Sequence, residues 1–408
     1  MIEPLGSEGR QSRLRSLFLS LKRHTSSGLY VPELDGLRFV AIFFVFIYHI
    51  AGVATNIPEG APPPASALYA LTQRLNIGVP LFFAISGMIL GLPFARYWLQ
   101  AGKKVSLKRY FLRRVTRLEP PYIIATVMFF VLKYIGHRGT IPEMLPHLGA
   151  SLVYLHNLIY RDLSTINSVA WSLEVEVQFY ILAPLLAIVF AIRTSWARRA
   201  AIGAAILLAA LWAPWAADPA LARDNPATWM KHLSLAGNIQ YFLTGFLLAD
   251  FFLLMPPITY RRQYWDTVSF IGWPLLIYLL IAAPDFAFIA LPGLILVLYA
   301  GVFYGNFSNR AFASVWVASI GGMCYSIYLL HNYMIQLIKI FTQRIGHAYP
   351  FEVRLVIQVV IMAPIVLVIS IVFYRLIEQP CMQPDWPVRL RDFVMRKGRR
   401  AILESKQA

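Results

Sequence analysis

Charged residues are scarce in this sequence. Asp, Glu, Lys and Arg make up 14% of its 408 residues, whereas hydrophobic residues make up 58%. Soluble proteins carry roughly 25% charged residues. The low charge and a mean hydropathy of +0.59 therefore exclude an ordinary soluble domain. We expect an all-α integral membrane protein whose helices form one bundle that is solvated largely by lipid.

Cysteine is scarce too, and several functional motifs are absent. The two cysteines, Cys324 and Cys381, lie far apart and fit neither a disulfide framework nor a metal site. The sequence has no P-loop, no G-x-G-x-x-G loop and no G-x-S-x-G nucleophile motif. We therefore predict no bound metal, no permanently bound cofactor and no covalent intermediate on an activated serine.

Apolar runs dominate what is present. About ten of them approach the roughly twenty residues that a helix needs to cross a bilayer. We expect these spans near residues 37–55, 77–95, 119–136, 170–192, 199–216, 235–255, 267–283, 286–305, 318–340 and 354–377. Residues 137–169 are predicted as a polar loop with a re-entrant or interfacial helix. Around the transmembrane domain at 33–380, basic tails are predicted at 1–32 and 381–408.

The positive charge follows these predicted spans. The formal net charge is +17, which in a soluble protein would suggest a nucleic-acid partner. Here about 26 Lys and Arg residues fall in the loops and tails of one side, against about seven on the other. This positive-inside pattern predicts that both termini are cytoplasmic, with the lipid bilayer and not nucleic acid as the partner of these charges.

The segment ELDGLRFVAIFFVFIYHI, residues 33–50, places a histidine deep inside an apolar run. Arg38 and His49 are eleven residues apart, so they share a helix face and lie about 16 Å apart along its axis. An ionisable residue inside a membrane span is costly and usually functional. The alternative is a histidine that is hydrogen-bonded between helices, with Arg38 as an interfacial anchor.

Two further predicted spans place ionisable residues at the depth of His49. Glu174 and Glu176 lie in the first turns of the fourth span, and His331 lies about 19 Å into the ninth. A histidine with a supporting carboxylate is the usual device for taking a proton from a hydroxyl, so these are candidate catalytic residues. Ser86, in AISG, is either a nucleophile or hydroxyl donor, or part of close helix packing.

Arginines gather at the cytoplasmic ends of the first and third predicted spans. Arg117 shares helical faces with Arg113 and Arg114, and Arg38 is expected at the same end. Such a cluster can grip the phosphates of a nucleotide-like donor through bidentate contacts. Lipid head groups and membrane topology also place basic residues here, so this alternative stays open.

Together these segments resemble the acyltransferase 3 family of integral-membrane O-acyltransferases. The resemblance covers nearly all of residues 33–380 and depends on ELDGLRFVAIFFVFIYH, VPLFFAISGMIL, RRVTRLEPPY, WSLEVEVQFY, YSIYLLHN and a closing IEQP. It implies a ten-span enzyme of the bacterial inner membrane that uses cytoplasmic acyl-CoA, usually acetyl-CoA, as co-substrate. The implied acceptor is usually a hydroxyl of a cell-surface or exported glycan, although some relatives acylate small molecules.

The resemblance also implies roles for individual residues. Arg38 and His49 match the family's arginine–histidine pair, and Glu174 and Glu176 fall in its acidic segment. Its RRxxR motif, linked to donor binding, is matched by Arg113, Arg114 and Arg117. Some relatives append an extracytoplasmic domain, whereas about thirty residues follow the last predicted span here. An acyl hand-off to a second domain is therefore expected either to use a separate protein or not to occur.

We therefore predict that an acyl-CoA binds the four arginines and that His49, supported by Glu174 or Glu176, deprotonates the acceptor hydroxyl. The main alternative is a transporter or flippase of a lipid-linked sugar, but the internal repeats typical of many transporters are not found. A weaker alternative is a membrane sensor whose histidine responds to pH.

Overall fold

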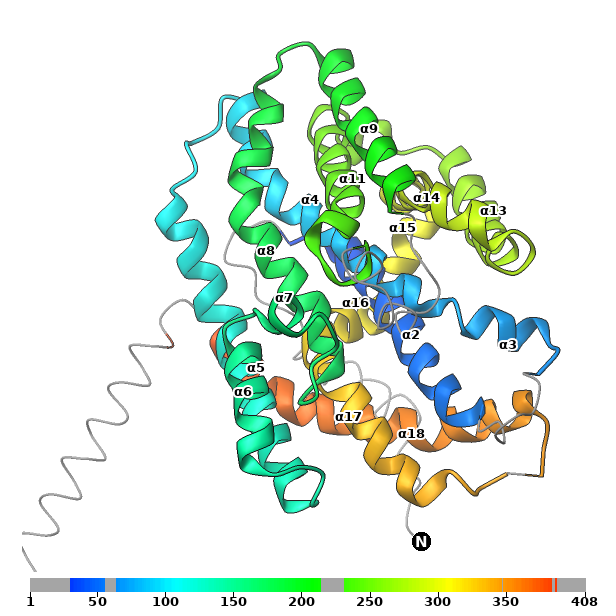
Figure 1. The fold of residues 1–408 in the computed structure, drawn as a ribbon. Coiled ribbons are helices and arrows are strands. Elements are labelled where there is room, and N and C mark those ends of the chain that lie inside the picture. Colours follow the sequence, from blue (N-terminus) through cyan, green and yellow to red (C-terminus); the bar gives the residue numbers. More distant parts are fainter. Residues whose placement is uncertain (1–29, 56–63, 214–230, 347, 384–385, 387–408) are drawn as a thin grey trace, which may run out of the picture.

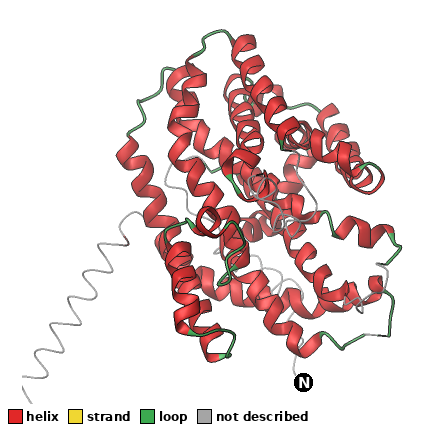
Figure 2. Ribbon diagram, viewed as in Figure 1, coloured by secondary structure: helices red, strands yellow, loops and turns green. Residues whose placement is uncertain are grey.

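The computed structural model describes residues 30–55, 64–213, 231–346, 348–383 and 386. This part of the chain is built from helices and contains no strand (Figures 1 and 2). The predicted all-α class is thereby confirmed. Most of the two predicted tails, at 1–32 and 381–408, falls outside the described residues.

The long helices follow the ten predicted spans in order. They are α2 Pro32–Thr55, α4 Gly78–Leu99, α5 Leu107–Ile135, α8 Trp171–Leu186, α9 Ser195–Trp212, α11 Leu235–Leu254, α13 Tyr264–Ala282, α14 Pro284–Tyr304, the pair α16 Val315–Gly322 and α17 Cys324–Thr342, and α18 Phe351–Phe373. Shorter helices connect them: α3 Ala67–Thr72, α6 Ile141–Leu152, α7 His156–Tyr160, α12 Pro257–Tyr260, α15 Phe307–Phe312 and α19 Gln379–Cys381. Single turns of 3₁₀-helix lie at Leu75–Ile77, Ser168–Ala170 and Ala187–Ala191, and a π-helical turn lies at Tyr374–Glu378.

Eight helical segments of the described chain are long and apolar enough to cross a membrane. The two predicted spans that are not among them are α9, whose first turns hold Arg198 and Arg199, and the pair α16–α17, which is interrupted at Met323. The chain is thus a multi-pass membrane protein. The exact number of crossings and the cytoplasmic position of both termini stay predictions.

Helix α2 runs through the middle of the bundle and packs against α4, α16, α17 and α18 (Figure 1). Helix α4 in turn lies along α11. A Cβ atom at Gly87 would be 2.1 Å from the carbonyl oxygen of Phe242, and one at Gly245 would be 2.2 Å from that of Ala84. Only glycine allows the two helices to cross this closely. The predicted close packing at AISG is therefore found, at Gly87.

A buried ion-pair network attaches α9 to α11. Arg198 and Arg199 both donate to the carboxylate of Asp250, Arg199 over 2.7 Å, and the aspartate is fully buried. The shared carboxylate pairs two arginines that would otherwise be costly to bury, although Nη2 of Arg198 has no hydrogen-bond partner in the described residues.

The loop between α5 and α8 folds into the hairpin α6–α7. Tyr122 of α5 donates a hydrogen bond to the carbonyl oxygen of Ser151 at 2.9 Å, and its ring stacks on Tyr154 with centroids 4.6 Å apart. The predicted helix in residues 137–169 is therefore confirmed as two short helices. Their packing fixes the first turn of α8, which carries the two predicted glutamates.

Candidate active site

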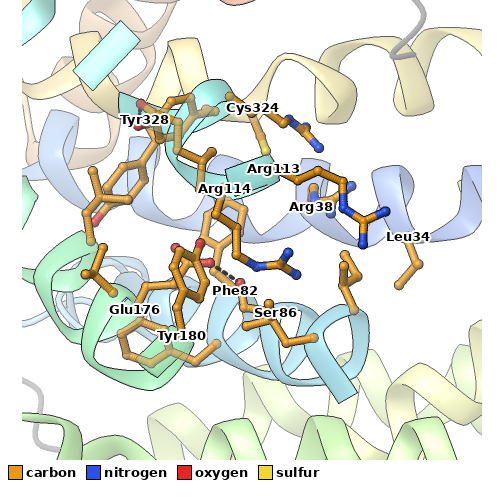
Figure 3. Close-up of a pocket in the computed structure, with 18 of the residues that line it drawn as sticks. Leu34, Arg38, Phe82, Ser86, Arg113, Arg114, Glu176, Tyr180, Cys324 and Tyr328 are labelled. Carbon is orange, nitrogen blue, oxygen red and sulfur yellow. Dashed lines mark hydrogen bonds between the residues drawn. The ribbon is translucent and has the colours of Figure 1, made fainter. Parts of the chain in front are cut away.

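A cavity of about 520 Å³ lies between α2, α4, α5, α8 and α17 (Figure 3). This volume is within the range of small-molecule sites. All four predicted arginines line it: Arg38, Arg113, Arg114 and Arg117. The structure thus brings together side chains from the first and third predicted spans, as the sequence indicated, and adds Arg96 from the end of α4.

Arg38 and Arg113 mark one end of this cavity, which we call the arginine end (Figure 3). Figure 3 shows Arg38 and Arg113 toward one end and Tyr328 toward the other. Arg38 forms an ion pair with Asp35, one turn earlier on α2. Arg114 lies over the ring of Tyr110, with 4.0 Å from its guanidinium carbon to the ring centroid. The arginine end is therefore positively charged, with Arg38 buried and Arg113 exposed.

Two of the arginines leave donors unused. The Nε atoms of Arg114 and Arg117 are buried and have no hydrogen-bond partner in the described structure. A buried donor without a partner costs free energy unless a ligand supplies an acceptor. These atoms therefore favour an anionic ligand at this end of the cavity.

The two predicted glutamates point in different directions. Glu176 lines the cavity and accepts a hydrogen bond from the hydroxyl of Ser86. Glu174 is completely buried away from it, and its Oε2 accepts the backbone N–H of Asn157 in the hairpin at 2.7 Å. The Ser86 hydroxyl thus donates to a carboxylate of the cavity, whereas its neighbour Gly87 makes the close helix contact.

The two predicted histidines meet. Their ring centroids are 5.0 Å apart. Nδ1 of His331 lies 2.8 Å from the carbonyl oxygen of Tyr328 and 3.1 Å from that of Ile327. Because a carbonyl only accepts, Nδ1 carries the proton and Nε2 has a free lone pair. Nε2 is buried and has no hydrogen-bond partner in the described part of the chain.

The predicted support of His49 by a carboxylate is not formed. In the described residues neither glutamate is a hydrogen-bond or ion-pair partner of His49, whose ring instead contacts His331 and Tyr48. Glu174 is engaged by the hairpin and Glu176 by Ser86. The prediction was wrong in this respect because similar depth in the membrane does not place two side chains on facing sides of their helices.

Sequence reasoning missed several residues of the cavity wall. Tyr328 and Ser172 share a hydrogen bond of 2.5 Å. Glu378 accepts two hydrogen bonds from Ser326, at 3.0 Å from its N–H and 2.5 Å from its hydroxyl, and thereby caps the start of α17. Tyr328 was detectable, since it lies three residues before His331 in YSIYLLHN and so on nearly the same helix face.

Comparison with known families identifies the chain. A family model for an acyltransferase domain, acyltransferase 3, matches residues 31–375. The chain belongs to the acyltransferase 3 family. The match covers α2, α4, α5, α8 and α17, and it confirms both the predicted family and the predicted enzyme class, an acyltransferase.

Matches with individual family members are partial. The chain is 29% identical over 185 residues to the peptidoglycan O-acetyltransferase OatA of Listeria monocytogenes, which covers 42% of this chain and 26% of that protein. It is 32% identical over 168 residues to O-acetyltransferase OatA of Staphylococcus aureus, or 38% of this chain and 24% of that protein. The matches thus span about a quarter of these relatives' length. No solved structure matches the chain.

Proposed function

We propose that this protein is a bacterial inner-membrane O-acyltransferase. It moves an acyl group, most readily acetyl, from cytoplasmic acyl-CoA to a hydroxyl of a cell-surface or exported glycan. The family match and the printed names of the relatives, which include a peptidoglycan O-acetyltransferase, support the reaction and the glycan class. In this proposal the arginine end of the cavity faces the cytoplasm.

One observation carries the proposal. The arginines line one end of the cavity, whereas Tyr328 at the other end has its ring centroid 5.6 Å from that of His331, which in turn neighbours His49. A molecule with phosphates at one end and a reactive carbonyl at the other fits this polarity. Acyl-CoA is such a molecule, and its phosphates are suited to the bidentate donors of the arginines.

The chemistry requires one base. His49 takes the proton of the acceptor hydroxyl as its oxygen attacks the thioester carbonyl, and the carbon–sulfur bond then breaks. The CoA thiolate leaves and recovers the proton from the imidazolium of His49. His331 is the neighbour of this base, with its lone pair on Nε2. The sequence has no G-x-S-x-G nucleophile motif, so direct transfer is favoured over an acyl-serine intermediate.

Thiol release from acetyl-CoA tests the proposal. The purified protein in detergent is incubated with acetyl-CoA, with and without glycan fragments such as peptidoglycan oligosaccharides. We expect release that requires the acceptor and that falls about 10²- to 10⁴-fold in His49→Ala, which is the usual contribution of a general base. His137→Asn is the matched control, because His137 is exposed in the loop after α5 and has a φ of 52° that asparagine tolerates.

Two results would contradict the proposal. Unchanged thiol release in His49→Ala would exclude His49 as the base. A folded wild-type protein that binds no acyl-CoA would exclude the donor and favour a transporter of a lipid-linked sugar.

A further inference from the structure

Part of the cavity wall lies next to the histidines, and we call it the closed end. Phe82, Ser172 and Tyr328 line it there, whereas neither His49 nor His331 does. Tyr328 lies between them, since its ring centroid is 5.9 Å from that of Phe82 on the cavity side and 5.6 Å from that of His331 on the other. One aromatic side chain therefore separates the cavity from the histidine pair.

Hydrogen bonds hold this side chain in place. The Tyr328 hydroxyl donates to the carbonyl oxygen of Val169 at 3.0 Å, so the 2.5 Å hydrogen bond with Ser172 must have the serine as its donor. Both Ser172 and Tyr328 are buried. Phe82 meets the tyrosine ring edge to face, with an interplanar angle of 76°. The closed end is thus a fixed surface contributed by α4, α8 and α17.

We propose that Phe82, Ser172 and Tyr328 form an end wall that limits the length of the acyl group. This inference rests on the proposed function. With the phosphates of the donor at the arginines, the acyl end reaches the wall, and each further methylene has to displace a packed aromatic ring. A short acyl group fits in front of the wall and a longer one does not.

The wall also separates the two substrates. An acceptor activated by His49 has only the Tyr328 ring between its oxygen and the acyl carbon, so this ring has to turn aside for transfer. The hydrogen bonds with Ser172 and Val169 keep it closed between turnovers. Tyr328 therefore has two separable features, a ring that sets length and a hydroxyl that holds the ring.

The test compares acetyl-, butyryl- and hexanoyl-CoA as donors for the purified protein. Wild type is expected to prefer acetyl-CoA. In Phe82→Ala the ratio of hexanoyl to acetyl turnover is expected to rise at least about tenfold, since one methylene in an apolar pocket is worth about 10- to 200-fold in selectivity. Tyr328→Phe keeps the ring and should keep the length limit, while it raises thiol release without acceptor. Phe43→Ala is the control, because Phe43 is 48% exposed and does not line the cavity.

Each other outcome is decisive. Equal turnover of all three donors by wild type overturns the end wall and leaves the proposed function intact. Thermal unfolding first shows that Phe82→Ala and Tyr328→Ala are folded. If the ratio of hexanoyl to acetyl turnover is then unchanged in both variants, the end wall is again overturned and the proposed function is left intact. Failure of the folded wild type to bind any acyl-CoA overturns the proposed function and this inference with it.

Discussion

The imidazole rings of His49 and His331 lie 5.0 Å apart, on α2 and α17, helices from opposite halves of the chain. The backbone of α17 uses Nδ1–H of His331 and leaves the lone pair of its buried Nε2 without a partner. In the mechanism that we propose, the second histidine takes the place that a carboxylate fills in many hydrolases and transferases. A neutral acceptor stabilises an imidazolium less than a carboxylate does, so the proposed pair supports the base without a second buried charge.

His331 should therefore matter for turnover and not for donor binding. In His331→Phe we expect kcat for acetyl transfer to fall at least about tenfold. The fall should not exceed the roughly 10²- to 10⁴-fold loss that removal of a general base causes. Binding of CoA, measured by calorimetry, should be unchanged because His331 does not line the cavity. His331→Asn, which keeps an acceptor, should recover part of kcat and show a shifted pH–rate profile. A loss of CoA binding that parallels the loss of kcat would instead indicate a structural role.

The shared depth of His49 on α2 and His331 on α17 could be predicted from the sequence for a physical reason. The length of a span and its direction fix the depth of each residue, and the 3.6-residue period fixes which residues of one helix share a face. Depth brought His49 and His331 into one layer, and periodicity grouped Arg113, Arg114 and Arg117. Both features depend on a single helix and a flat membrane, so they can be calculated without the tertiary structure.

Rotation of one helix against its neighbours could not be calculated. Glu174 and Glu176 are two positions apart, about 200° around the helix axis, so one faces the hairpin and the other the cavity. Which of the two glutamates faces the cavity depends on how α8 packs between α7 and α4. The break between α16 and α17 at Met323 was missed for a similar reason, since the sequence GGMC interrupts an otherwise apolar run without a proline.

The arginine end should bind the phosphates of CoA. Replacement of Arg114 or Arg117 by alanine is expected to weaken CoA binding about tenfold each, because each removes a charge-assisted contact worth about 1.4 kcal/mol or more. Lysine should recover only part of the affinity, as it cannot form a bidentate contact. Calorimetry with CoA and with pantetheine, which lacks phosphates, separates the contributions.

Arg109→Ala is the matched control for these variants. Arg109 is exposed on the same helix, and the cavity wall does not include it. If Arg109→Ala weakened CoA binding as much as Arg117→Ala, the weaker binding would come from the loss of surface charge in general and not from the loss of a specific contact. If pantetheine binding fell in parallel with CoA binding, the arginines would shape the cavity and not recognise phosphate.

Substitution of the two glutamates should affect different properties, CoA binding for Glu176 and stability for Glu174. Glu176 shares the cavity with the arginines and interacts electrostatically with Arg38 and Arg114. Glu176→Gln removes this negative charge, so CoA binding is expected to tighten about three- to tenfold. Glu174→Gln should leave CoA binding unchanged and lower the free energy of unfolding by about 1 kcal/mol, since the N–H of Asn157 exchanges a carboxyl acceptor for an amide oxygen. Equal effects of both variants on CoA binding would refute this division of roles.

The crossing of α4 and α11 should tolerate no side chain. Gly87→Ala places a methyl group against the backbone of Phe242 and is expected to destabilise the protein by about 1–3 kcal/mol, as overpacking does. Gly52→Ala on α2 is the control, because a Cβ there meets nothing within 4 Å. It should raise stability by roughly 0.5–1 kcal/mol through the better helix propensity of alanine. Thermal unfolding in detergent measures both, and shifts of the same sign would contradict the assigned crossing.

The hairpin between α5 and α8 should loosen in mild acid. His156 is buried, and its Nδ1 donates to the carbonyl oxygen of Asp162 at 3.2 Å, so its Nε2 accepts from Nδ1 of His147 at 2.8 Å. A second proton on His156 would face the N–H of His147. Burial, and then the charge of His147, lower the pKa of His156 below its ordinary value.

The sign of the effect follows from this direction. A histidine whose pKa is lower in the folded hairpin binds its proton more readily when the hairpin opens, so stability is lost as pH falls through about 6.5, the ordinary histidine pKa. Hydrogen exchange of residues 141–160, corrected for intrinsic rates, should show lower protection at pH 5.5 than at pH 7.5, with α11 unchanged. His156→Gln should abolish this difference.

Because Asn157, the next residue, donates to Glu174 at the start of α8, opening of the hairpin releases the helix that carries Glu176 into the cavity. A pH-independent hairpin in wild type would exclude His156 as the group that links acid to this release.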